Sequence, residues 1–114
     1  MKHKESELQQ NCVKWFKLYY PSKIIFAIPN GGSRNVIEAS RLKREGTLAG
    51  VADLCILVAN STYHALFIEM KIGKGYQTIN QKDFEQYCKK QDYQYSVCRS
   101  LDQFIEIVTN YFKC

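Results

Sequence analysis

Two acidic residues and a lysine stand at the ends of two apolar stretches. Asp53 precedes the apolar run 54–58, and Glu69 follows the apolar run 66–68. Residues 59–62 between them have the composition of a turn, so we expect strands over 53–58 and 63–71 to pair as an antiparallel hairpin. Because Asp53 and Glu69 lie equally far from Ser61 along the chain, a hairpin centred there places them directly opposite each other.

Opposed carboxylates are chemically unusual in a sheet. Directly opposed residues have Cβ atoms about 4.5–5.5 Å apart, and like charges at that distance are destabilising. Such a pair requires a raised pKa or a cation between the two groups. Mg²⁺ prefers carboxylate oxygens and fills its remaining positions with water. Lys71 lies two positions after Glu69 and therefore shares its face of the strand, so we expect two acids and an amine in one cluster.

The same residues also allow a purely structural interpretation. Asp53 and Glu69 could lie at strand ends in solvent, or Glu69 could simply pair with Lys71. A register error of one residue would move one carboxylate to the other face of the sheet. The hydrogen-bonding register of the hairpin therefore decides between the two interpretations.

The rest of the pattern predicts a single α/β domain over residues 1–114, with elements in the order αβ(α)ββαβα. We expect a helix over 5–20 that ends at Pro21, a strand over 23–28 followed by a turn-rich loop, and a basic helix over 34–45 with Gly46 as its C-terminal cap. After the hairpin come the loop 73–75, a helix over 78–91, a strand over 93–98 and a last helix from about residue 101.

Helical spacing indicates which side chains face inward. Glu5 and Gln9 extend the apolar stripe of the first helix, whereas Glu7 does not, so Glu5 is the better candidate for a carboxylate that reaches the cluster. Gln81 lies on the inward stripe of the helix over 78–91. The expected stripes are Leu8, Cys12, Val13 and Phe16, then Gln81, Phe84, Glu85 and Cys88, and finally Leu101, Phe104, Ile105, Val108 and Phe112.

Charge permits a polyanionic partner without identifying one. The chain of 114 residues carries a net charge of +5 and has a pI near 9.0, which suits nucleic acid. The helix over 34–45 holds Arg34, Arg41, Lys43 and Arg44. This helix is either a solvated face or a phosphate-contacting surface, and both interpretations stay open.

The five cysteines form an odd set without a CxxC pair. This arrangement favours reduced, mostly buried thiols over a disulfide frame, a zinc site or an iron–sulfur cluster. No segment reaches the roughly 20 apolar residues of a membrane span, and the charged start does not resemble a secretory signal. We therefore expect a soluble, intracellular protein, with His3 and His64 on its surface.

A family resemblance rests on several blocks in a fixed order. Segments 50–54 (GVADL) and 67–71 (FIEMK) resemble the D…ExK core of the PD-(D/E)XK nuclease superfamily. Segments 5–9, 28–32 and 43–50, and Gln81 with Phe84, are similar to the stand-alone, phage-type members of the virus-type replication-repair nuclease (VRR-NUC) domains. The resemblance covers nearly the whole chain and implies a cytoplasmic protein of a bacterial or phage-infected cell. Ala52 stands where the superfamily name has proline, a position that often varies.

The resemblance implies a restriction-endonuclease-like core, with a mixed central sheet flanked by helices, and a set of roles. Asp53, Glu69 and Glu5 would hold Mg²⁺, or Mn²⁺ as a substitute, together with the backbone carbonyl of Met70. Lys71 would orient or help deprotonate the attacking water and offset charge in the transition state. Gln81 would orient Lys71 or the water.

The implied activity is that of a Mg²⁺-dependent, structure-selective endodeoxyribonuclease of DNA repair and recombination, acting as a homodimer on branched DNA such as Holliday junctions. The alternatives are a restriction-type nuclease or nickase on duplex or flap DNA, and a catalytically silent nucleic-acid-binding module. The intact trio of Asp53, Glu69 and Lys71 counts against silence. The expected DNA-contacting residues are Asn30, Gly31, Ser33, Arg34, Arg41, Lys43, Arg44 and Lys74.

Overall fold

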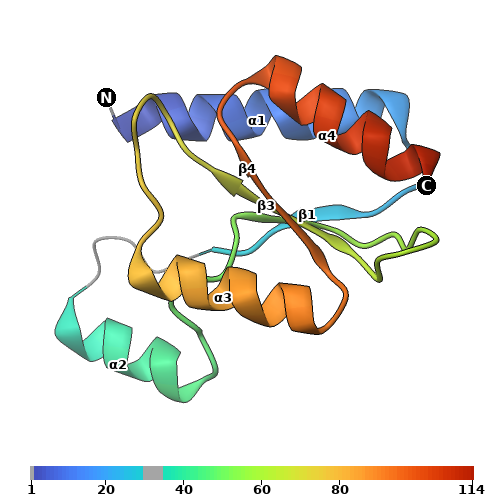
Figure 1. Ribbon diagram of the computed structural model, residues 1–114. Coiled ribbons are helices and arrows are strands. Elements are labelled where there is room, and N and C mark those ends of the chain that lie inside the picture. The colour runs from blue at the N-terminus through green and yellow to red at the C-terminus, as the bar shows by residue number, and fades with distance from the viewer. Residues whose placement is uncertain (1, 30–34) are drawn as a thin grey trace.

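A four-stranded sheet lies between helices in the computed structural model, which describes residues 2–29 and 35–114 (Figure 1). The strands are β1 (Ile25–Ala27), β2 (Leu54–Ile56), β3 (Leu66–Met70) and β4 (Gln94–Cys98), in the spatial order β1-β2-β3-β4. The helices are α1 (Lys2–Tyr19), α2 (Val36–Arg44), α3 (Ile79–Lys90) and α4 (Leu101–Lys113). The predicted α/β class and order of elements are confirmed.

The sheet is mixed, as the resemblance implied. β1, β2 and β3 pair antiparallel, whereas β3 and β4 pair parallel. A parallel pair requires a crossover connection, and α3 supplies it between β3 and β4. The carboxyl end of β3 therefore leads directly into the loop before α3, so residues at that end lie close to the start of this helix.

One face of the sheet is covered by α1 and α4 (Figure 1). Leu54, Ile68 and Met70 point to this side and pack with the expected helical stripes, of which Cys12, Phe16, Phe104 and Val108 are fully buried. Tyr111 belongs to the same core, and its hydroxyl donates a 2.6 Å hydrogen bond to the carbonyl of Val58. Tyr111 was not part of the predicted stripe of the last helix. A tyrosine can be buried only where its hydroxyl finds an acceptor, and helical spacing does not show where that acceptor lies.

The opposite face is covered by α3 (Figure 1). Phe67 of β3 meets Phe84 of α3 at 5.3 Å between ring centroids. α3 begins with a capping box: the Thr78 side chain accepts from the Gln81 backbone N–H, and the Gln81 side chain accepts from the Thr78 N–H. This reciprocal cap fixes the first turn of α3.

Gly50 allows the chain to pass close to α3. Its φ is +90°, and a Cβ at this position would lie 2.5 Å from the backbone carbon and oxygen of Asn80. Only glycine fits both conditions. The segment before β2 is thereby held against the first turn of α3.

α2 contributes no buried residue and lies at the margin of the molecule (Figure 1). Four of the five cysteines are buried and Cys114 is exposed, so the predicted burial of most thiols is confirmed. His3 and His64 are exposed, also as predicted. Among the residues described, no helix is both long enough and apolar enough to cross a bilayer.

Candidate active site

The register of the central hairpin agrees with the prediction. Leu54 pairs with Ile68 and Cys55 pairs with Phe67, so the next opposed positions are Asp53 and Glu69. Leu54 and Ile68 point into the core under α1 and α4. Because side chains alternate along a strand, Asp53 and Glu69 share the face that α3 covers.

Asp53 is fixed by two backbone contacts. Its carboxylate oxygen Oδ2 accepts a 2.7 Å hydrogen bond from the backbone N–H of Met70, and its carbonyl accepts one of 2.9 Å from Ile28. The N–H and C=O of one strand residue point to the same edge of the strand. The Met70 carbonyl therefore lies on the same side of β3 as the Asp53 carboxylate.

Among the residues described, Glu69 is the one charged residue that is buried, with 3% of its surface exposed. Its Oε2 accepts a 2.8 Å hydrogen bond from Nε2 of Gln81 and lies 3.8 Å from Nζ of Lys71. Its other oxygen, Oε1, is buried and receives no hydrogen bond from any described residue. A buried acceptor without a donor is costly, so this oxygen is a strong candidate for binding a cation.

The environment raises the pKa of Glu69 to about 8. Burial is the largest cause, followed by the negative charge of Asp53 and a contact in which the two carboxyl groups share a proton; Glu5 adds a smaller effect, and Lys71 acts in the opposite direction. The shared proton exists only while one carboxyl is protonated. The metal-free protein keeps this proton up to about pH 8. Once Glu69 is ionised, no donor among the described residues replaces the proton at Oε1, so a cation can take its place.

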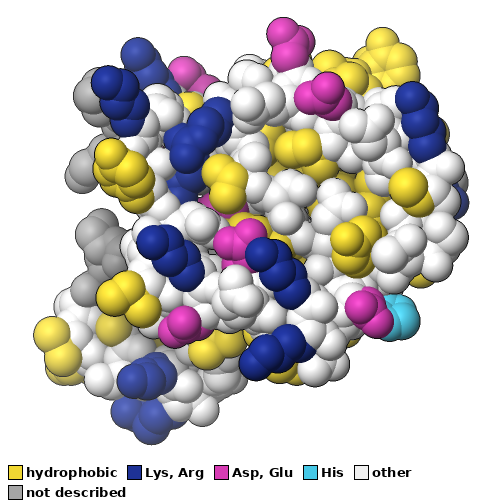
Figure 2. All heavy atoms as spheres, viewed as in Figure 1, with side chains coloured by type: hydrophobic (Ala, Val, Ile, Leu, Met, Phe, Trp, Pro, Cys, Tyr) yellow, Lys and Arg dark blue, Asp and Glu magenta, His cyan; other side chains and the backbone are white. Residues whose placement is uncertain are grey.

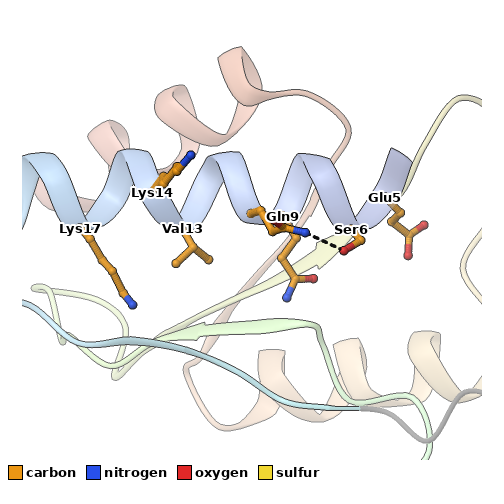
Figure 3. Close-up of a pocket in the computed structure, with 7 residues that line it drawn as sticks. Glu5, Ser6, Gln9, Val13, Lys14 and Lys17 are labelled. Atoms are coloured by element: carbon orange, nitrogen blue, oxygen red, sulfur yellow. Dashed lines mark hydrogen bonds between the residues drawn. The ribbon is translucent and has the colours of Figure 1, made fainter. Parts of the chain in front are cut away.

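Glu5 approaches this cluster from the first turns of α1. The apolar stripe predicted that the Glu5 side chain lies on the buried side of the helix, but the side chain is exposed. Partial desolvation and then the charge of Asp53 raise the pKa of Glu5, whereas Lys71 lowers it. Glu5 therefore lies within electrostatic reach of both residues, and Figure 3 shows it at the outer end of the row of side chains along α1.

The chain is similar to known proteins over nearly its whole length. Residues 1–102 match the model of the VRR-NUC domain. The chain belongs to the VRR-NUC family. A solved structure described as a VRR_NUC domain protein is similar over 96% of this chain and 88% of that one, with 31% sequence identity and a TM-score of 0.79. No curated protein gives a match.

As a VRR-NUC domain, the chain is a nuclease domain of the PD-(D/E)XK type, a class that is typically metal-dependent. Residues 2–29 and 35–114 contain no preformed group of three His, Cys, Asp or Glu side chains that could hold a metal. Mg²⁺, however, is usually held by one or two carboxylates with several waters. Asp53, Glu69 with its unsatisfied oxygen, and the Met70 carbonyl fit that requirement.

The candidate site has neighbours that could not be expected from the sequence. Nε2 of Gln77 donates to Glu85 at 3.0 Å and to the Tyr95 hydroxyl at 3.2 Å. Burial chiefly raises the pKa of Tyr95, and the charges of Glu69 and Asp53 contribute, so the ring stands near the carboxylates. The pairing of Phe67 with Tyr95 places this tyrosine on the same face as Glu69. That register follows only once β3 and β4 are known to run parallel.

Arg99 organises the loop that follows Lys71. Its guanidinium donates to the carbonyls of Gly73 and Gly75 at 2.9 and 3.0 Å. Two donors from one rigid group fix the loop more firmly than a single contact would. The spacing of residues gave no signal for this contact, because Arg99 is 24 positions or more away from the loop.

The structure describes only some of the residues that are expected to contact DNA. Lys43, Arg44 and Lys74 are exposed, and Arg41 pairs with Glu45 at 3.1 Å. Figure 2 shows acidic side chains near the centre of one face with lysine and arginine side chains around them. Asn30, Gly31, Ser33 and Arg34 lie outside the described residues.

Proposed function

We propose that this VRR-NUC domain is a metal-dependent, structure-selective DNA endonuclease that resolves four-way (Holliday) junctions as a homodimer. The observation that carries the proposal is the buried carboxylate of Glu69, which lies beside Asp53 with one oxygen unsatisfied and the other contacted by Gln81 and near Lys71. A structural ion pair would not leave a buried oxygen without a partner.

In the proposed site, Asp53, Glu69 and the Met70 carbonyl hold the metal, with Glu5 reaching it directly or through water. Mg²⁺, or Mn²⁺ in its place, supplies a bound water of lowered pKa and neutralises charge on the phosphate oxygens. Gln81 holds Oε2 of Glu69 and thereby fixes which lone pairs remain for the metal. The role of each residue is positioning and electrostatic stabilisation.

Lys71 is the group proposed to orient the attacking water. Its side chain is 13% exposed and lies 3.8 Å from Glu69, so it is held beside the metal site without being a ligand. The attacking water forms a bond to phosphorus and releases a proton to solvent water, while the bond to the leaving oxygen of the sugar breaks and that oxygen takes up a proton from solvent. Lys71 orients that water and offsets the negative charge that develops on the phosphoryl oxygens.

The dimer and the branched substrate rest on size and charge. A chain of 114 residues holds one such site, and resolution of a junction requires two symmetric cuts. A two-fold dimer places identical sites at equivalent positions on a pseudo-symmetric junction. The exposed side chains of Lys43, Arg44 and Lys74 would contact phosphates, which select shape rather than sequence.

The test is a cleavage assay on labelled four-way junctions, flaps and linear duplexes with Mg²⁺, Mn²⁺ or Ca²⁺, using wild-type protein and Asp53→Asn. We expect paired cuts in the junction with Mg²⁺ or Mn²⁺, little cleavage with Ca²⁺, and loss of cleavage in the variant. The asparagine oxygen can still accept from Met70, so circular dichroism and thermal unfolding should show an intact fold.

Three results would change the proposal. Normal turnover of Asp53→Asn at saturating Mg²⁺ would remove this residue from the site. A monomer by light scattering that cuts one strand, or prefers linear duplex, would indicate a nickase or a restriction-type enzyme. Binding without cleavage of any substrate under any metal would indicate a silent nucleic-acid-binding module.

A further inference from the structure

A groove runs along one side of α1 and begins at Glu5. It has a volume of about 570 Å³, and the α1 residues that line it are Glu5, Ser6, Gln9, Gln10, Val13, Lys14 and Lys17. None of these residues except Glu5 belongs to the cluster around Asp53. The groove is therefore a separate surface that meets the candidate active site at one end.

The side chains form a row along the helix. Ser6, Gln9, Val13 and Lys17 recur at three- and four-residue spacing, and Figure 3 shows them pointing to the same side of α1. This spacing aligns residues on one face of a helix. The row runs from Glu5 at the site to Lys17 near the end of the helix, where the lysine points into the groove.

The chemistry of the row suits a sugar–phosphate backbone. Beyond Glu5, the lining holds two lysines, a hydroxyl and two amides, and no further acid. Amide and hydroxyl donors and lysines are the groups that contact phosphates in protein–DNA complexes, and Val13 offers an apolar contact for a sugar ring. Nε2 of Gln10 already donates to the Ser6 hydroxyl at 3.1 Å, which leaves the Ser6 proton available to an acceptor.

The length of the row fits several nucleotides. At 1.5 Å per residue, the distance from Glu5 to Lys17 along the helix is about 18 Å. One strand of B-form DNA carries a phosphate roughly every 3.4 Å along the helix axis, so the groove spans about five nucleotides. Lys17 would then meet a phosphate well away from the bond that is cut.

We propose that the α1 groove binds the backbone of the DNA strand on one side of the scissile phosphate, with Lys17 as its distal phosphate contact. This inference rests on the proposed nuclease function and extends it. It assigns α1 the role of a track that aligns one strand with the site, whereas α2 and the loop at Lys74 supply other contacts.

The test is fluorescence-anisotropy binding of a labelled four-way junction and of one of its linear duplex arms, measured in Ca²⁺ over a range of NaCl concentrations. Lys17→Gln is compared with wild type and with Lys90→Gln, a matched control on α3 at the opposite face of the sheet (Figure 1). Both lysines are exposed, so neither variant should alter the fold, which circular dichroism checks.

When one phosphate contact is lost, the plot of log affinity against log salt becomes less steep. Its slope changes by about 0.9 on duplex DNA and by about 0.7 on a single strand. We expect that change for Lys17→Gln. Between roughly 50 and 200 mM salt the variant should lose about threefold less affinity than wild type. Lys90→Gln should leave the slope unchanged.

A second measurement locates the contact. One phosphate at a time is replaced by a neutral methylphosphonate, and the penalty is measured with wild-type protein and with Lys17→Gln. We expect one position whose penalty disappears in the variant, as in a double-mutant cycle. The groove assignment would be overturned if Lys17→Gln had the same salt slope as Lys90→Gln, or if wild type and Lys17→Gln showed the same penalty at every phosphate. Either result would leave the nuclease proposal standing. Failure of wild-type protein to bind either DNA at low salt would overturn both.

Discussion

Replacing Glu69 by glutamine should stabilise the metal-free protein above neutral pH. Glutamine has nearly the same shape, its oxygen can still accept from Gln81, and its amide can donate to the carboxylate of Asp53. The substitution removes a buried negative charge without leaving a cavity. The expected effect follows from the pKa of Glu69, which rises from an ordinary 4.5 to about 8 in the folded protein.

The sign follows from proton binding. Below pH 4.5 the glutamate is protonated whether the chain is folded or unfolded, so it has no effect. As the pH rises from 4.5 to about 8, the unfolded chain releases the proton while the folded protein keeps it, and the free energy of unfolding falls. At about 1.4 kcal/mol per pH unit, the penalty reaches up to roughly 5 kcal/mol above pH 8, a large part of the stability of a small domain.

The measurement is urea unfolding in the presence of a chelator, between about pH 5 and pH 9, for wild type, Glu69→Gln and the exposed control Glu106→Gln. The wild-type curve and the control should fall with pH, and the Glu69→Gln curve should stay nearly flat. Mg²⁺ should restore part of the wild-type stability at high pH, because it binds the folded state. Parallel curves for wild type and Glu69→Gln would refute the reasoning.

Two further predictions concern Lys71 and Gly50. Lys71→Met should reduce turnover severely while calorimetry shows Mg²⁺ affinity retained, because the ammonium group is not a ligand; lost metal affinity with intact turnover would contradict its role. Gly50→Ala should lower the urea midpoint, and the free energy of unfolding should fall by about 1–3 kcal/mol. The reason is that the new Cβ meets the backbone of Asn80 and residue 50 has a positive φ. An unchanged midpoint would mean that the contact with Asn80 relaxes freely.

The central hairpin shows what local sequence can predict. A hairpin centred on Ser61 is one of the registers that the turn composition allows, and the observed pairing of Leu54 with Ile68 confirms it. The positions of Gln81 and Phe84 also followed, because helical periodicity reports which face turns inward. These features depend on contacts within one element or between neighbours in the chain.

Contacts between distant segments could not be predicted in this way. Arg99 reaches back to the carbonyls of Gly73 and Gly75, and Gln77 reaches Tyr95, through side-chain geometry that no periodicity encodes. Glu5 had been placed on an inward stripe, yet its side chain is exposed and acts on Asp53 at the open end of the sheet. Helical spacing gives the direction of a side chain and not what lies opposite it.

The hydrogen bond from the Met70 N–H gives the Asp53 carboxylate a structural role in addition to its proposed role in metal binding. The ladder between β2 and β3 ends at Leu54 and Ile68, and the Asp53 side chain takes the place of the next backbone acceptor, as an extra rung. Loss of that acceptor would leave the Met70 N–H unpaired at a cost of about 1–3 kcal/mol. Mutation therefore cannot easily replace Asp53 without weakening the fold. A descendant chain without nuclease activity would conserve its fold best by keeping aspartate or changing it to asparagine.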